Sequence, residues 1–312
     1  MENDLLLTPQ EVADILKIKK NTVYEMIKRG SLPAKKMGKQ LRILSSSVKK
    51  YLCEQENVGN TSLVLPLETL NTDPYIVPSP PTFILSGQDE ILDQICNLIN
   101  QKFRNIQMLR SYLDSYNGLY AMYQEQVTLA TCNLWDNKTN TYNLPFINKL
   151  FPGEDIGVYH ICNRTQGFYV ANGNPKNIFG FKDLARTDII FLNREKGSGT
   201  RVLLDSMLKK LSIDPQKIQG YFRSVTSPLV AANTVAKNGA DFALGPERTS
   251  LEISKVDFIP LQKESFDLVI RNSDLNKEPV KYILELLCSS NFQEEIGQLK
   301  GYDIVGIGEK LL

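Results

Sequence analysis

Four short segments of the sequence place serine, threonine or glycine where a strand should end and a helix begin. They are Ser86-Gly87-Gln88-Asp89, Ser115-Tyr116-Asn117-Gly118, Gly197-Ser198-Gly199-Thr200-Arg201 and Thr226-Ser227-Pro228. The start of a helix presents unpaired backbone N–H groups and a partial positive charge, hydroxyl groups add donors, and glycine allows close approach. If several of these turns meet at one cleft, they form a site for an oxyanion that needs no metal ion.

Ordinary helix capping explains any one of these turns taken alone. The segment from Gly197 to Arg201 goes further, because it joins two glycines, two hydroxyl groups and an arginine shortly after Phe191-Leu192-Asn193-Arg194. It is not a nucleotide-binding P-loop, since the spacing GxxxxGK[ST] is missing. This segment is therefore the best candidate for an anion site.

Other chemistry has little support in the sequence. The single histidine, His160, lies in the apolar run GVYHICN and is predicted to be structural. We find no convincing nucleophile–base pair and no His-rich metal site, so we expect neither an enzyme nor a metal protein. The cysteines are odd in number and form no CxxC pair, which indicates reduced thiols; they are Cys53, Cys96, Cys132, Cys162 and Cys288.

The elements that would position the turns alternate between strand and helix. Strands are expected in FILSG, IQMLRSYLDS and VTLATCNL, and helices at Asp89–Phe103 and Asn117–Gln124. This rhythm predicts a mostly parallel sheet covered by helices. Further elements are expected at Ile189–Leu211, Asp241–Leu244, Val256–Ile259 (a strand stopped by Pro260), Pro279–Leu287 and Asn291–Gln298.

Length and charge divide the chain. Its 312 residues suit two or three compact units. Residues 1–52 carry eleven Lys or Arg against five Asp or Glu, whereas the remainder carries 25 against 30. A basic head on a mildly acidic body is typical of a nucleic-acid-binding module joined to a second domain. The chain shows neither a signal peptide nor a membrane-spanning run, so we expect a cytoplasmic protein.

The basic head has the pattern of a helix, a tight turn and a second helix. Thr8-Pro9-Gln10-Glu11 predicts a capping box at the first helix, and the second is expected from Asn21 to Arg29, ended by Gly30. The run from Lys35 to Ile43 predicts a basic hairpin that follows the phosphate backbone, and a short third helix should run from Ser45 to Tyr51. A solvated face on a protein-interaction module is the alternative.

These residues resemble the excisionase-family winged helix-turn-helix domain, related to the MerR type. The resemblance rests on Leu7-Thr8-x-x-Glu11-Val12-Ala13-x-x-Leu16, Thr22-Val23-Tyr24, Arg29-Gly30-x-Leu32-Pro33-Ala34 and Arg42-Ile43. The family often caps its recognition helix with serine, where this chain has Lys19; Asn21 is expected to cap instead. The resemblance implies double-stranded DNA as the partner, contacted by Lys20, Asn21, Thr22, Tyr24, Lys28 and Arg29, and in the wing by Lys35, Lys36, Lys39 and Arg42.

A linker is expected at residues 53–81, where Pro78-Ser79-Pro80-Pro81 indicates a semi-rigid spacer. Residues 82–312 then resemble the substrate-binding domain of the periplasmic-binding-protein superfamily, in the branch similar to molybdate- and tungstate-binding proteins. The residues that carry the likeness include Arg164-x-Gln166-Gly167, Gly173-Asn174-Pro175, Asn193-Arg194-x-x-Gly197-Ser198-Gly199-Thr200-Arg201 and Asp241-x-x-Leu244-Gly245. The family commonly has His-Leu near the strand at Thr131–Asp136, where this chain has Cys132-Asn133-Leu134-Trp135-Asp136, which leaves the identity of the ligand open.

The resemblance implies an α/β fold of type II with two lobes and a cleft between them. Lobe one would combine about 82–165 with 260–312, and lobe two would span about 166–259. The expected ligand residues are Ser86, Ser115, Ser198 and Thr200, with Thr226, Gly197 and Gly199; Arg164 and Arg201 are candidate charge partners or structural ion-pair members.

The sequence therefore predicts a one-component transcription regulator that senses a small oxyanion and acts as a homodimer on a two-fold DNA site. Molybdate and tungstate are the first candidates, and no cofactor is expected. Two alternatives remain open. One is a regulator of a different small anionic metabolite, and the other is a DNA-architectural protein of excisionase type.

Overall fold

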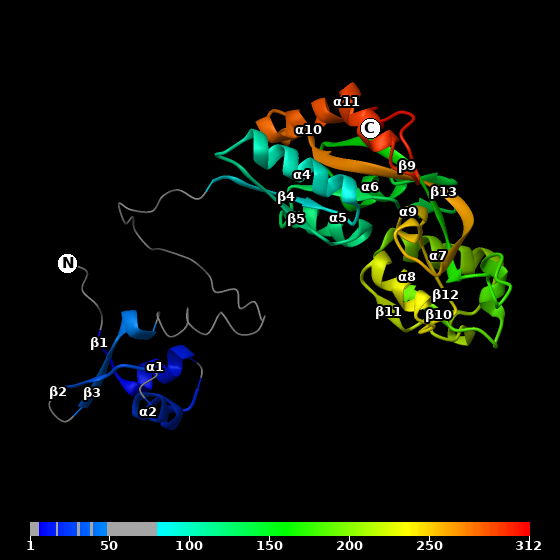
Figure 1. The fold of residues 1–312 in the computed structure, drawn as a ribbon. Helices are drawn as coiled ribbons and strands as arrows, with labels where there is room; N and C mark the ends of the chain where they lie inside the picture. Colours follow the sequence, from blue (N-terminus) through cyan, green and yellow to red (C-terminus); the bar gives the residue numbers. More distant parts are fainter. Residues whose placement is uncertain (1–5, 17, 30–31, 38–39, 49–79) are drawn as a thin grey trace. The chain divides into compact units, whose positions relative to one another are not determined.

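The computed structural model describes residues 6–16, 18–29, 32–37, 40–48 and 80–312. They form two compact units, one in the N-terminal part and one that takes in everything from residue 80 onward (Figure 1). Several predictions lie outside the described residues: the helix end at Gly30, the wing residue Lys39, Tyr51, Cys53 and most of the linker.

The N-terminal unit is a helix-turn-helix with a hairpin. Helices α1 (Pro9–Leu16) and α2 (Lys20–Lys28) pack on an antiparallel sheet of order β1-β3-β2, and residues 45–48 are helical. The strands are β1 (Leu6–Leu7), β2 (Lys35–Met37) and β3 (Gln40–Leu44). The core joins both helices, β3 and residues 45–48 through Val12, Ala13, Val23, Leu32, Ile43 and Val48.

The predicted capping box of α1 is confirmed. The Thr8 backbone N–H donates to Glu11 Oε2 at 2.6 Å, and the Glu11 N–H donates to Thr8 Oγ1 at 3.2 Å. The predicted cap of α2 is wrong: the helix begins at Lys20, and Lys19 takes the N-cap position without a side-chain hydrogen bond. Asn21 is therefore inside the first turn, where its side chain faces solvent.

The second unit is built on a nine-stranded sheet of order β11-β10-β12-β9-β13-β6-β4-β5, with β14 beside β9. The pairs β4–β5, β4–β6, β10–β11 and β10–β12 are parallel, but all pairs that involve β9 or β13 are antiparallel. The sheet is thus mixed rather than mostly parallel. Its strands are β4 (Thr82–Ser86), β5 (Gln107–Ser111), β6 (Leu129–Cys132), β9 (Ile156–Ala171), β10 (Phe191–Arg194), β11 (Ser224–Val225), β12 (Phe242–Pro246), β13 (Val256–Arg271) and β14 (Tyr302–Asp303); a small hairpin adds β7 (Trp135–Asp136) and β8 (Thr141–Tyr142).

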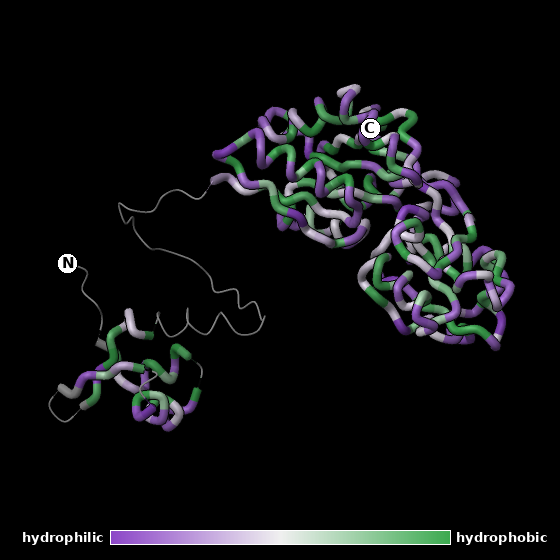
Figure 2. Tube along the Cα trace, viewed as in Figure 1, coloured by the Kyte–Doolittle hydropathy of each residue, from purple (hydrophilic) through white to green (hydrophobic). Residues whose placement is uncertain are grey.

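Helices cover this sheet in two lobes (Figure 1). In the first lobe, one sheet face packs on α4, α10 and α11 and the other on α5 and α6. In the second lobe, α7 and α8 cover opposite faces of β10 and β12. Hydrophobic segments run through the interior of both lobes (Figure 2). The helices are α4 (Glu90–Lys102), α5 (Ser115–Tyr123), α6 (Leu144–Leu150), α7 (Gly199–Leu211), α8 (Pro228–Ala236), α9 (Glu247–Leu251), α10 (Glu278–Cys288) and α11 (Ser290–Gly297).

Two long strands, β9 and β13, pass from one lobe into the other and pair along their whole lengths. The prediction that a strand would stop at Pro260 is wrong, because β13 continues through it to Arg271. The register shifts between Pro260 and Gln262, and a proline is tolerated at such a bulge because no ladder hydrogen bond is required of it. The bulge lies where the strands cross between the lobes, opposite Gly167.

Most of the other predicted elements are confirmed within a few residues. The prediction that Ser115 precedes its helix is wrong, because α5 begins at Ser115 and Asp114 is its N-cap. His160 is buried and pairs with Asp267 at 2.7 Å, consistent with a structural residue. Among the described residues, no helix is long and apolar enough to cross a membrane.

Candidate functional site

The starts of α5 and α7 face each other across the two lobes. The Tyr116 backbone N–H donates to the Gly197 carbonyl at 2.8 Å, and Asn117 Nδ2 donates to the Lys196 carbonyl at 2.9 Å. Gly197 has φ +90°, and a Cβ there would lie 2.1 Å from Asn117 Oδ1. Only glycine can combine this backbone conformation with so close an approach, so the Gly197 position is fixed by contact between the lobes.

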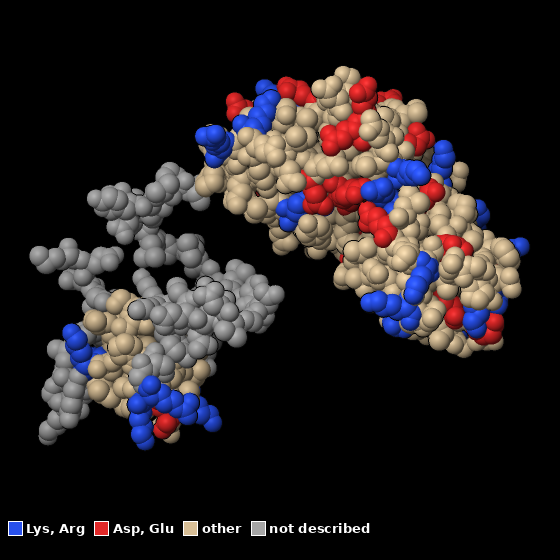
Figure 3. Space-filling model, viewed as in Figure 1, with Lys and Arg blue, Asp and Glu red and all other residues tan. Residues whose placement is uncertain are grey.

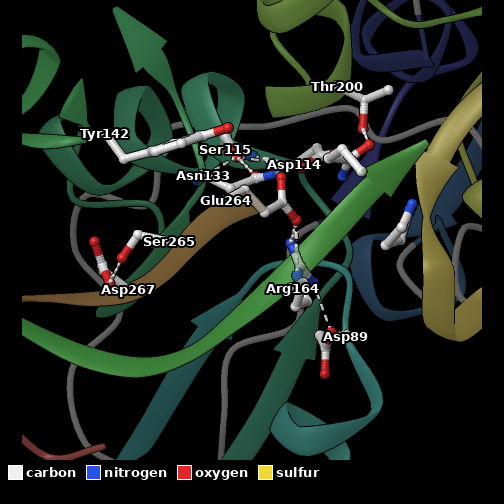
Figure 4. A network of polar contacts seen from close by, with 12 residues as sticks. Asp89, Asp114, Ser115, Asn133, Tyr142, Arg164, Thr200, Glu264, Ser265 and Asp267 are labelled. Atoms are coloured by element: carbon white, nitrogen blue, oxygen red, sulfur yellow. Dashed lines mark hydrogen bonds and ion pairs between the residues drawn. The ribbon is translucent and has the colours of Figure 1, made fainter. Parts of the chain in front are cut away.

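A buried polar network runs beneath this contact (Figure 4). The Ser115 hydroxyl donates to Asn133 Oδ1, and Asn133 Nδ2 donates to Glu264 Oε2 at 2.6 Å. Glu264 Oε1 accepts from Arg164 Nε at 2.8 Å, and Arg164 Nη1 donates to Asp89 Oδ2 at 2.6 Å. These hydrogen bonds connect α5, β9 and β13 with the N-cap of α4.

The second lobe meets this network at the start of α7. A Cβ on Gly199 would lie 2.2 Å from Asn133 Oδ1, so the amide of Asn133 packs directly on the backbone of the first helical turn. Thr200 Oγ1 donates to Gln166 Oε1 at 3.4 Å. The amide oxygen of Asn133 thus lies where a helix start favours negative charge.

The positive charge of Arg164 is balanced by two carboxylates, those of Asp89 and Glu264. Burial disfavours its charged form, but the carboxylates of Glu264 and Asp89 outweigh that effect and raise the pKa of Arg164. Burial raises the pKa of Glu264, and its hydrogen bonds and the Arg164 charge only partly oppose the rise. With two carboxylates around one guanidinium, Glu264 is the group that takes up a proton more readily than an ordinary glutamate.

Arg201 is a structural ion-pair member. Its Nε lies 2.9 Å from Asp205 Oδ1, and its Nη1 donates to the Arg194 carbonyl at 3.1 Å. The guanidinium also stacks 4.3 Å from the centre of the Tyr221 ring. These contacts hold the side chain along α7, away from the start of α5, and favour the structural alternative.

Arg194, which sequence reasoning did not single out as a ligand residue, joins the lobes. It is 2% exposed, and its Nη2 donates to Asp114 Oδ2 at 2.7 Å, to the Thr226 carbonyl at 3.0 Å and to Gln88 Oε1 at 3.3 Å. Its Nε has no hydrogen-bond partner among the described residues. The only sequence signal was its place three residues before the Gly197–Arg201 segment.

The remaining predicted ligand residues have more local roles. Ser198 is fully buried and caps α7 by accepting from the Arg201 N–H at 3.1 Å. Ser86 is also buried and donates to the Leu113 carbonyl at 3.1 Å. Thr226 contributes its backbone carbonyl to the site. This carbonyl accepts from Gln88 Nε2 at 2.7 Å and from Arg194 Nη2 at 3.0 Å.

An open groove of about 380 Å³ adjoins the network on the outside of the lobe boundary. Asp89, Thr226 and Tyr302 belong to its lining, together with Tyr112 and Arg248. Arg248 lies near Glu90 across the lobes, and acidic and basic atoms lie side by side at this boundary (Figure 3).

Most of the predicted DNA-contacting residues that the structure describes are exposed on the head. The six on and beside α2 are exposed, as is Lys35, whereas Arg42 is half-buried in β3; the six are Lys20, Asn21, Thr22, Tyr24, Lys28 and Arg29. Lys36 belongs to β2, and its side chain lies outside the described atoms. Among the described residues, no group of three His, Cys, Asp or Glu side chains could hold a metal ion.

Comparison with known proteins agrees with both units. The model of a helix-turn-helix domain matches residues 6–56, and that of a PBP superfamily domain matches residues 96–288. The uncharacterized protein YvgK of Bacillus subtilis (strain 168) is 35% identical over 306 residues, which are 98% of this chain and 97% of that protein.

Two solved structures share the fold of the second unit. A phosphate-type ABC transporter substrate-binding protein from Clostridium perfringens, solved with phosphate, has a TM-score of 0.52 at 12% identity and covers 71% of this chain and 98% of its own. The regulatory domain of CcmR from Synechocystis PCC6803, in complex with 2-PG, has a TM-score of 0.50 at 13% identity and covers 66% and 94%.

A helix-turn-helix unit joined to a two-lobed binding unit is the architecture of a ligand-sensing DNA-binding regulator. The chain belongs to the PBP superfamily. Neither matching domain is of an enzymatic type.

Proposed function

We propose that the protein is a one-component transcription regulator in which a small oxyanion, with molybdate or tungstate as the first candidates, binds between the lobes and alters the affinity of the head for operator DNA. The proposal includes a homodimer, because helix-turn-helix proteins read two-fold sites as pairs. It also places the protein in the cytoplasm, where operator DNA is found.

The main support for an oxyanion ligand is Nε of Arg194, which is buried and has no hydrogen-bond partner among the described residues. A buried N–H group without an acceptor costs about 1–3 kcal/mol, more when the group is charged. Three acceptors share Nη2 of the same guanidinium, while Nε has no acceptor in the part of the chain that the structure describes. An anion oxygen at Nε would form a charge-assisted hydrogen bond and remove this cost.

The donors around Asn133 support the same class of ligand. The Ser115 hydroxyl and the first turn of α7 both meet the amide oxygen of Asn133. An oxyanion offers oxygens to the same donors and carries more charge, so it can displace this amide oxygen at a helix start. The fold accommodates phosphate in the Clostridium perfringens protein.

An anion bound at this site would contact residues of both lobes. Arg194 and the Gly197–Gly199 turn belong to the second lobe, whereas Asp114, Asn117 and Asn133 belong to the first. A ligand shifts an equilibrium only by its difference in affinity for the two states, and a ligand held by both lobes binds the closed state more tightly. Closure is the event that we expect to change DNA affinity.

An anionic metabolite is the second candidate, and the groove favours it. Tyr112 and Tyr302 line a space of about 380 Å³ beside the network, which is larger than an inorganic oxyanion requires. A small organic acid could place its anionic group at Arg194 and its carbon skeleton against these rings.

Calorimetric titration of the full chain with molybdate, tungstate, sulfate and phosphate tests the proposal. We expect one of them to bind tightly to the wild type and about 10- to 100-fold more weakly to Ser198→Ala, because the Ser198 hydroxyl accepts from the Arg201 N–H and can donate its own proton to an anion at the start of α7. Ser289→Ala is the matched control, because Ser289 also caps a helix by accepting from an N–H three residues on. Both variants lose a cap worth about 1 kcal/mol, but only the first should lose the ligand.

No binding of any of the four anions to folded, ligand-free protein would exclude the inorganic oxyanion and leave the organic acid to be tested. The DNA arm uses fluorescence anisotropy with sequences enriched from random DNA by the wild type. Addition of the anion that binds should change the Kd for DNA, and an unchanged Kd would contradict its role as an effector.

A further inference from the structure

The outward face of α2 contains one acidic residue, Glu25, whose charge does not suit a phosphate-binding surface. At 3.6 residues per turn, Asn21, Glu25 and Lys28 form one stripe along the helix. Val23, Met26 and Ile27 lie on the opposite side, where Val23 is fully buried and the other two pack against the core of the head. Glu25 is therefore at the middle of the face that points away from the head.

Glu25 is the one carboxylate of α2, and it is exposed. Lys28 and Arg29 follow it at three and four residues, yet Glu25 makes no ion pair with either of them. It borders a surface hollow together with Asn21, Thr22 and Arg29. Figure 3 shows acidic atoms enclosed by basic ones over this helix.

A carboxylate here cannot add general affinity for DNA, because phosphate groups repel it. Its favourable partners in a major groove are exocyclic amino groups of the bases. The N4 amino group of cytosine has no second acceptor on its own base, whereas adenine N6 lies between its own N7 and the O4 of thymine, whose lone pairs would repel the second carboxylate oxygen. The chemistry thus favours cytosine.

We infer that Glu25 determines sequence specificity, by accepting a hydrogen bond from the N4 amino group of a cytosine in each half-site. The inference rests on the proposed DNA-binding function and adds to it the base pair that one side chain selects. Asn21 and Lys28 flank Glu25 on the same stripe and would contact the adjoining base pairs or phosphates.

Selection from random double-stranded DNA with the full chain tests this inference, with Glu25→Gln, Glu25→Ala and the wild type in parallel. The wild-type motif should contain a C·G pair at one position of each half-site. Glu25→Gln should prefer A·T at that position, because an amide pairs with adenine N6 and N7, and the exchange of preference should be about 10- to 100-fold. Glu25→Ala should lose the preference there alone and bind non-specific DNA more tightly.

Asp14→Asn is the control, because it removes an exposed carboxylate from α1 in the same head. It should leave the motif unchanged. An unaltered C·G preference in Glu25→Gln, or uniform weakening at every position with the helical content retained by circular dichroism, would overturn the inference. Failure of the wild type to enrich any sequence would contradict the proposed function itself.

Discussion

Asp114 uses its two carboxylate oxygens for two different tasks. Oδ1 accepts from the Ser115 N–H at 2.9 Å and caps α5, while Oδ2 lies 2.7 Å from Nη2 of Arg194 on β10 of the other lobe. The start of the helix that carries Ser115 is therefore connected to the guanidinium whose Nε has no partner in the described chain. Any anion that reaches Nε acts on the contact between the lobes.

Arg194→Gln should weaken both ligand binding and closure. We expect oxyanion affinity to fall at least about 100-fold and the free energy of unfolding to fall by about 3 kcal/mol, because Asp114 is left largely buried without its cation. Calorimetric titration, urea denaturation and small-angle scattering measure the three effects, and the radius of gyration should increase. Arg186→Gln breaks an exposed pair with Asp188 and should change stability much less than Arg194→Gln does. Unchanged affinity in Arg194→Gln would remove the main support for the oxyanion.

Gly167→Ala should disturb the crossing between the lobes. A Cβ there would lie 2.3 Å from the Ile259 carbonyl oxygen and 2.4 Å from the Phe258 ring, at the register shift beside Pro260. Since backbone cannot move aside cheaply, we expect a loss of about 2–4 kcal/mol in the free energy of unfolding. Gly180→Ala is the control, because nothing lies within 4 Å of its Cβ position and its backbone is extended. Equal stability of the two variants would contradict the tight crossing.

Glu264→Gln should change how stability depends on pH. Burial raises the pKa of Glu264 above its ordinary 4.5, so the folded protein holds this proton more tightly than the unfolded chain. The stabilising contribution is complete at pH values below 4.5 and is lost as the pH rises through the folded pKa. Relative to the wild type, the variant should therefore gain stability as the pH rises above 4.5. Arg164 keeps its ion pair with Asp89 in the variant.

Urea denaturation at several pH values measures this difference. Asp303→Asn, which removes a mostly exposed partner of Lys263, should leave the pH profile unchanged. A wild-type stability that rises relative to Glu264→Gln as the pH increases above 4.5 would have the opposite sign and contradict the assignment of Glu264 as the proton-binding group.

Local signals in the sequence were sufficient for most elements and for the head. The capping box at Thr8 and Glu11, the helical period of α1 and the pairing of β2 with β3 all depend on residues within a few positions of one another. The predicted turns at Ser115 and Ser198 also came from local patterns. The structure brings both serines to the start of helices that face each other.

The network around these serines could not be derived in the same way. Asn133 and Glu264 are 131 residues apart, and only the register of β13 turns Glu264 inward. Arg164 and Arg201 seemed to be available charges, but their carboxylate partners lie on other elements or one helical turn away. Local preference predicted that a strand would end at Pro260. In the structure β13 continues through Pro260, because β13 pairs with β9 along its whole length and accommodates the proline at a bulge. Long-range pairing determines which polar groups are satisfied.

The wing offers a test of phosphate contact that is independent of base recognition. Lys35 and Arg42 are directly opposed in the antiparallel pair of β2 and β3. Like charges opposite each other destabilise a hairpin, so a polyanion alongside it would compensate for their repulsion.

Lys35→Ala should weaken binding to all DNA sequences alike and reduce the slope of log K against log salt by about 0.9, as expected for one phosphate contact. Lys237→Ala, an exposed lysine after α8, removes the same charge from the body and should leave the slope unchanged. If the two variants have the same slope as the wild type, Lys35 does not contact the phosphate backbone.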